Sequence, residues 1–333
     1  TLCTDFLPSS LEHISYEGHL WAWPSWIAVK CWAGNAKILR DLGINTQDVL
    51  IHGWSYNDVL NMIKVLEEQE RNIHHDYARY GLVLDTTSTH TLDTLMQAVG
   101  IGTEDQLPAD CSIIWEKNAL KSSLSFLEDI KLIKGFPRPV HTMTDRLLEL
   151  FWTGRTAIIG PVGPGFLRHV RERQDKMARG GLFKGMEVIE PILLPVPHPE
   201  GNMGFPYINI HAAMVFMCPG VGCKSSAYLA VRFAEILAQK EALWLAGELP
   251  IVPARIKDQK SEANYSEFVS SDTWDFILRS AVTGKPYYDS FYKKRKKGLI
   301  GSGEQRISSI LNEFWQGILT VDQFEQRLYD TTS

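Results

Sequence analysis

Short runs of strand-forming residues alternate along this chain with amphipathic helical segments. Residues 55–71 repeat apolar side chains at helical spacing, and Ser55 with Asp58 three positions later is typical of a capping box. Residues 78–84 then indicate a short buried strand, and residues 156–159 indicate a second one. Alternation of this kind predicts an α/β architecture, in which helices cover a sheet.

Further helices and two irregular segments complete the pattern. We expect helices at residues 118–134, 144–152, 225–246, 272–282, 304–316 and 321–329. The sequence GPVGPG at 160–165 is expected to form a glycine-rich turn, and five prolines predict that residues 190–206 are extended and loop-like. The chain has no clean linker, so two lobes would have to be interleaved along it.

The composition limits the kinds of protein that this chain can be. Of its 333 residues 44% are hydrophobic, so the chain can bury a sizeable core. Its 34 basic and 39 acidic residues give a net charge of −5, which argues against a nucleic-acid partner. No apolar run approaches the ~20 residues of a membrane-spanning helix. Five cysteines are too few for a disulfide framework.

The sequence carries no recognisable catalytic, metal or cofactor motif. PGVGCKSS at 219–226 resembles a phosphate-binding loop, but Cys218 and Cys223 replace both glycines that this motif requires. These two cysteines flank a Pro-Gly turn, and a disulfide and two free thiols are equally compatible with them. The patterns G-x-S-x-G and H-E-x-x-H do not occur. We therefore expect no catalytic residue, no metal ion and no cofactor.

Five segments occur in an order that carries a resemblance to a known family. They are the stretch from EGHLWAWPSW (17–26) through GNAKILRDLGI (34–44) to HGWSYNDVLNMIKVL (52–66), LFWTGRTAIIGPVGP (150–164), EPILLPVPHPEG (190–201), AYLAVRFAEILAQKEALWLAGELPIVPAR (227–255) and QGILTVDQFEQRL (316–328). In this order they resemble the extracellular solute-binding proteins of ABC transporters, family 1, the maltodextrin-binding type.

The resemblance implies a fold and a division of the chain. The implied fold is the α/β periplasmic-binding-protein type II fold, with two lobes of interleaved segments. By segment order, residues 1–22 and 207–262 would belong to lobe one, and residues 23–206 and 263–333 to lobe two. Family members begin with further strands and helices that build most of the first lobe. None precede Thr1 here, so we expect the first lobe to be incomplete.

The resemblance also implies a function. Two lobes close about a hinge on a solute, here a sugar or an oligosaccharide, and deliver it to the permease subunits of an ABC transporter. Such a protein is a monomer and not an enzyme. It lies outside the cytoplasm as a periplasmic protein or a cell-surface lipoprotein, although no signal sequence is present in this chain. A glycoside-acting enzyme and a truncated fragment without ligand function are the alternatives.

The same resemblance suggests which side chains contact the solute. Trp23 and Trp26 are expected to stack on it near the hinge, and Tyr207 lies where a glycine-aromatic loop of the family returns to lobe one. The stacking aromatic of the family's G-P-W motif is replaced by Val162, so Phe166 is its expected substitute. The full set of expected ligand-binding residues is Trp23, Trp26, His90, Gly163, Phe166, Tyr207 and Glu304.

Overall fold

The computed structural model divides the chain into two compact units. It describes residues 3–16, 19–71, 79–85, 89–99, 117–133, 144–180, 189–201, 204, 206–216, 224–260, 269–286 and 302–329. Unit 1 comprises Thr1–Lys30, Gly163–His169 and Pro206–Pro286, and unit 2 comprises Cys31–Val162, Val170–Phe205 and Tyr287–Ser333. Residues 23–30 and 263–286, expected in lobe two, are grouped with unit 1. The lobes derived from segment order stay a prediction.

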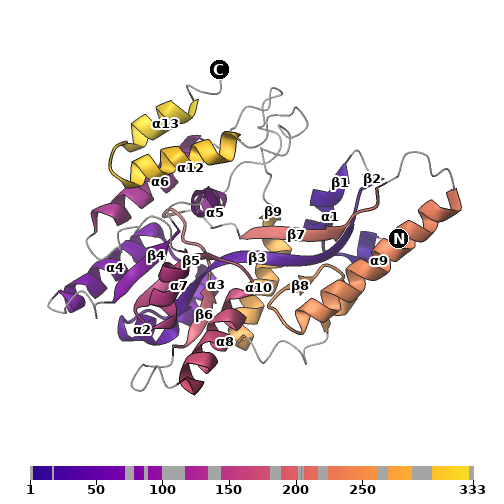
Figure 1. Ribbon diagram of the computed structural model, residues 1–333, viewed down its shortest axis with the longest axis horizontal. Helices are drawn as coiled ribbons and strands as arrows, with labels where there is room; N and C mark the ends of the chain where they lie inside the picture. Colours follow the sequence, from indigo (N-terminus) through magenta and orange to yellow (C-terminus); the bar gives the residue numbers. More distant parts are fainter. Residues whose placement is uncertain are drawn as a thin grey trace. The chain divides into compact units, whose positions relative to one another are not determined.

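One long strand, β3 (Trp23–Asn35), belongs to both units, because unit 1 ends within it at Lys30 and unit 2 begins at Cys31. The strand has two sets of partners, one for each half. Residues 23–30 pair with strands of unit 1, and residues 31–35 pair with strands of unit 2. Figure 1 shows it as the longest of the strands that the structure describes.

In unit 2, the second half of β3 runs antiparallel to β5 (Thr156–Val162) and to β6 (Pro191–Leu194). Strand β4 (Tyr80–Leu84) is parallel to β5. The strands expected at 78–84 and 156–159 are therefore present. The expectation for 160–165 is wrong at its start, because β5 continues through Val162. Residues 190–206 are likewise not wholly loop-like, since Pro191 opens strand β6.

Helices supply most of the core of unit 2. They are α2 (Ala36–Asp41), α3 (Thr46–His52), α4 (Tyr56–Glu70), α5 (Thr89–Val99), α6 (Lys117–Leu132), α7 (Thr144–Trp152), α8 (Phe166–Arg179), whose first residues belong to unit 1, α12 (Ser302–Trp315) and α13 (Val321–Tyr329). The capping box predicted at the start of α4 is confirmed, with Ser55 and Asp58 each bonding the backbone of the other. Trp32, Leu82 and Phe314 are fully buried in the shared core.

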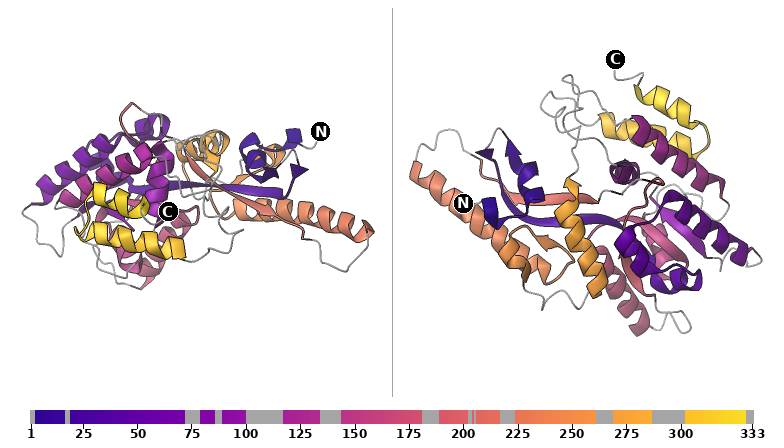
Figure 2. Two further views of the ribbon diagram at one scale, coloured as in Figure 1. Left: turned by 90° about the horizontal axis from the view of Figure 1, so that it is seen from above. Right: turned by 180° about the vertical axis from the view of Figure 1, so that it is seen from behind.

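In unit 1, the first half of β3 runs antiparallel to β7 (Tyr207–Ala213) and also pairs with β8 (Val252–Pro253). The short strand β9 (Lys285–Pro286) is parallel to β7. The remaining elements are η1 (Cys3–Asp5), α1 (Pro8–Ile14), β1 (Ser15–Tyr16), β2 (His19–Leu20), α9 (Lys224–Ala246), η3 (Ile256–Lys260) and α10 (Ser271–Thr283). Figure 2 shows α9 extending along β3 and β7.

Helix α9 is apolar on two opposite faces. Small side chains spaced four residues apart face the strands and are buried: Ala234, Ala238, Ala242 and Ala246. Large side chains cover the other face and are at least half exposed: Leu229, Phe233, Ile236, Leu237 and Trp244. The described part of this helix thus packs mainly through its alanine stripe, although a helix that is apolar all round is usually buried on all sides.

The two cysteines of the predicted Pro-Gly turn, Cys218 and Cys223, are not among the described residues. The state of their thiols therefore stays open. Over the described ranges, no helix combines the length and apolarity that crossing a membrane requires.

Candidate functional site

Polar and aromatic side chains share one face of the β3–β7 strand pair in unit 1. Three pairs of residues lie directly opposite each other: Trp26 with His211, Ala28 with Asn209, and Lys30 with Tyr207. Residues two apart in a strand point to the same side, and directly opposite residues of an antiparallel pair do so too. These six side chains therefore project from one surface, which we call the β3–β7 face.

One end of the β3–β7 face is closed by an aromatic stack. The rings of Trp26 and His211 lie 3.6 Å apart between centroids with 9° between their planes. The other surroundings of Trp26 are apolar, and Ala242 and Ala246 of α9 pack with it. The indole Nε1 of Trp26 is buried without a hydrogen-bond partner. Trp26 is thus a packed residue whose ring is covered by His211.

The surroundings of the His211 imidazole lower its pKa and so favour its neutral form. Burial against Trp26 lowers the pKa of His211 because it penalises the charged ring; the carboxylate of Glu241 opposes this shift, and the ammonium of Lys30 adds to it. Glu241 also accepts a hydrogen bond from the Ser25 hydroxyl at 3.0 Å. At neutral pH this ring therefore acts as an uncharged hydrogen-bonding group.

At the other end of the β3–β7 face, Lys30 lies against the segment that leads into α8. A Cβ placed on Gly163 would lie 3.9 Å from the Lys30 ammonium, which is an ordinary van der Waals distance, so Lys30 lies beside this segment. Phe166 donates its backbone N–H to the Gly163 carbonyl at 3.1 Å. Arg168 pairs with Glu248 at 2.5 Å and thereby ties this segment to the end of α9.

The two aromatic residues expected at this end are both buried. Tyr207 lies opposite Lys30 and is 5% exposed, and Phe166 is 9% exposed. Lys30 itself is partly buried. Of the expected set, the structure therefore places Trp26 and Tyr207 on the β3–β7 face and Gly163 beside it. Phe166 lies near this face because its backbone N–H bonds the carbonyl of Gly163.

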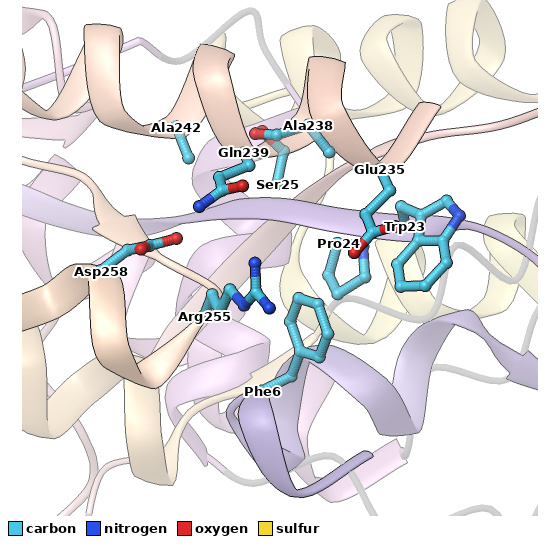
Figure 3. A pocket seen from close by; sticks show the side chains of 10 residues that line it. All are labelled: Phe6, Trp23, Pro24, Ser25, Glu235, Ala238, Gln239, Ala242, Arg255 and Asp258. Carbon is cyan, nitrogen blue, oxygen red and sulfur yellow. The ribbon is translucent and has the colours of Figure 1, made fainter. Parts of the chain in front are cut away.

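Trp23 lines a separate cavity of unit 1, shown in Figure 3. The cavity is small and partly open to solvent, and it lies between α9, the start of β3 and η3. The guanidinium of Arg255 lies between the ring of Phe6 and the carboxylate of Asp258. Arg255 Nε and Asp258 Oδ2 are buried without a hydrogen-bond partner. The cavity thus combines two aromatic rings, Phe6 and Trp23, with unsatisfied polar atoms.

The last two expected residues belong to unit 2. His90 is exposed on α5, and Glu304 lies in α12, where its side chain is outside the described residues. Sequence reasoning missed three members of the β3–β7 face: Lys30, Asn209 and His211. A signal for two of them was present, because Tyr207, Asn209 and His211 alternate with Ile208 and Ile210. Within the described part of the chain, no cluster of side chains could hold a metal ion.

Comparison with known proteins identifies the fold. No protein-family model and no curated protein sequence matches this chain. Solved structures do match: the GacH receptor of Streptomyces glaucescens, studied with acarbose, has a TM-score of 0.69 at 13% identity, covering 98% of this chain and 74% of that one. The chain has the periplasmic-binding-protein type II fold. The α/β prediction and the fold implied by segment order are confirmed.

Two further structures give the same result. The maltose-bound MalE3 protein of T. maritima has a TM-score of 0.67 at 14% identity, with 99% of this chain and 76% of that chain covered. The sugar-binding protein MalE of Xanthomonas citri has a TM-score of 0.69 at 14% identity, with 99% and 74% covered. At these identities the likeness establishes the periplasmic-binding-protein type II fold alone.

Proposed function

We propose that the protein binds a sugar or an oligosaccharide and delivers it to the permease subunits of an ABC transporter. The observation that carries the proposal is the fold, which this chain shares over 98–99% of its length with proteins described as maltose-bound, acarbose-complexed and sugar-binding. In this proposal the protein is a monomeric binding protein and not an enzyme. It acts outside the cytoplasm, as a periplasmic protein or a cell-surface lipoprotein.

The β3–β7 face suits this function chemically. Sugars are held by aromatic surfaces against their C–H groups and by polar side chains that satisfy their hydroxyls. Asn209 offers an amide, Lys30 an ammonium, and the neutral His211 an exposed ring with a nitrogen that can hydrogen-bond. Trp26 and Tyr207 are buried and support these side chains by packing. Ala28, opposite Asn209, is buried in the cluster that contains Trp26 and two alanines of α9. The proposed contact with the solute is therefore carried by the three polar side chains.

We propose that lobe closure bends the chain within strand β3. In proteins that close on a ligand, a few residues of a connecting strand or loop absorb the change in backbone angles. We propose that residues 30–31, where β3 leaves unit 1, belong to such a hinge. A solute that contacts the β3–β7 face and also the other lobe would then favour the closed state.

A thermal unfolding experiment tests sugar binding directly. The 333-residue chain would be melted with and without maltose, maltotriose, maltohexaose, acarbose and uronic acid oligosaccharides. A saccharide at 100 times its dissociation constant adds about 2.7 kcal/mol to the free energy of unfolding, which raises the melting temperature by several degrees. A cooperative melt that no saccharide shifts would contradict the proposal.

A pair of variants assigns the effect to the β3–β7 face. Asn209→Ala should reduce the shift, because the amide is lost from the face. Asn61→Ala, on the exposed surface of α4 in unit 2, should leave the shift unchanged. Equal shifts in both variants would place the bound sugar elsewhere.

A further inference from the structure

The ammonium of Lys30 is a partly buried cation on the β3–β7 face. No described residue forms an ion pair or a side-chain hydrogen bond with it, although its Nζ lies next to Gly163. A Lys ammonium has three protons to donate and no capacity to accept. Because a cation withdrawn from water is costly when it has no acceptor, this position suits a partner that arrives with its own negative charge.

The rest of the β3–β7 face does not supply that charge. Tyr207 and Asn209 are uncharged, and the low pKa of His211 keeps its ring neutral at pH 7. Glu241 of α9 is a carboxylate that acts electrostatically on His211, and it accepts a hydrogen bond from Ser25 near the Trp26 end of the face. Among the described residues it forms no ion pair with Lys30. The described part of the face therefore has one unpaired positive charge at its Lys30 end.

We propose that the solute is an acidic saccharide whose carboxylate binds the ammonium of Lys30. The inference rests on the proposed sugar-binding function and specifies its substrate class. A carboxylate accepts the Lys30 protons in charge-assisted hydrogen bonds, which are stronger than those a neutral hydroxyl accepts. The hydroxyls of the same saccharide are then left for Asn209 and for the ring nitrogen of His211.

The experiment compares acidic and neutral forms of one saccharide on the unaltered chain. Calorimetric titration with di- and trigalacturonate, with their methyl esters and with maltotriose measures each dissociation constant. We expect the free acid to bind at least 10-fold more tightly than its methyl ester, and this ratio to fall as sodium chloride is raised, because salt screens the pair. The comparison needs no variant, so it stands even if a substitution impairs folding.

Variants then assign the preference to Lys30. Lys30→Met should reduce the ratio of acid to ester affinity to about one, and Lys30→Arg should keep most of it. The matched control is Lys64→Met, on the exposed side of α4, which should leave the ratio unchanged.

The possible failures are distinct. If maltotriose or the methyl ester binds as tightly as the acid, or if Lys30→Met keeps the ratio, the acidic-saccharide proposal is overturned and the sugar-binding function stands. If none of the saccharides in this panel or in the melting panel binds, the proposed function fails, and the inference fails with it.

Discussion

Trp26 and His211 stack face to face across two antiparallel strands, with 3.6 Å between ring centroids. The stack joins residues that are far apart in the sequence. It withdraws part of the otherwise exposed imidazole from solvent, which lowers the pKa of His211. The same contact that packs the tryptophan therefore links the stability of unit 1 to pH.

The stability of the protein should fall when His211 takes up a proton. Burial lowers the pKa of His211 below its ordinary value of about 6.5, so the unfolded chain binds a proton at a higher pH than the folded chain does. The contribution is fully present above about pH 6.5, and it is lost as the pH falls from there to the lowered pKa. We expect His211→Gln to remove this part of the decline in the free energy of unfolding, measured by urea denaturation between pH 7.5 and 5.

The control for this pH effect is His52→Gln, which alters an exposed side chain on α3 near Asp48. It should follow the pH dependence of the unaltered protein. If His211→Gln shows the same decline as the unaltered protein, the stack does not couple stability to pH.

A methyl group at position 160 should destabilise unit 2. A Cβ on Gly160 would overlap the indole ring of Trp32, which is fully buried. We expect Gly160→Ala to cost about 2–3 kcal/mol, because a packed core resists added volume. Gly163→Ala is the matched control, since its Cβ would only meet Lys30 Nζ at 3.9 Å, and it should change the free energy of unfolding by less than about 0.5 kcal/mol. Equal losses in urea denaturation would contradict the overlap.

The carboxylate of Glu70 should contribute to stability far more than a surface carboxylate does. Its oxygens accept hydrogen bonds from Arg79 Nε at 2.7 Å and from the Arg79 backbone N–H at 3.0 Å, and the side chain is 5% exposed. Glu70→Ala leaves these donors without a partner, at a cost of about 2–3 kcal/mol. Glu190→Ala, which removes an exposed pair with Arg40, should cost less than about 1 kcal/mol. A larger loss for Glu190→Ala in chemical denaturation would reverse this ranking.

The two faces of α9 should respond oppositely to substitution. Phe233 is 65% exposed, so Phe233→Ser should change the free energy of unfolding by less than about 0.5 kcal/mol. Ala246 packs with Trp26 and Ile251, and Ala246→Leu should cost about 1–3 kcal/mol by overfilling that contact. Thermal melts of both variants check the difference. A large loss for Phe233→Ser would mean that this face is packed in solution.

Local signals in the sequence were enough to predict many elements. Helix α4 carries its own start signal in Ser55 and Asp58, and its apolar spacing is complete within one window. The errors have a shared cause. Residues 160–162 contain glycine and proline, which favour a turn locally, but pairing of Val162 with Cys31 and of Gly160 with Leu84 extends the strand. Pro191 favours a loop by composition, but proline is tolerated as the first residue of a strand, and it opens β6.

The candidate site was less predictable than the helices. The alternation of Tyr207, Asn209 and His211 could be seen in the sequence. Their strand partner, β3, lies far away in the sequence, near the N-terminus. No local pattern fixes which residue of β3 lies opposite which residue of β7. Lys30 becomes a site residue only through its register with Tyr207 and the approach of Gly163.

Strand β3 also has a consequence for how the protein is made. Its second half can pair with β5 and β6 once residue 194 has left the ribosome, whereas its first half waits for β7 at residues 207–213 and for β8 at residues 252–253. During this interval a nascent chain holds Trp26 and Lys30 on a half-paired strand, and unpaired strand edges are prone to aggregation. The β3–β7 face is therefore assembled after β5 and β6 have become available to the second half of β3.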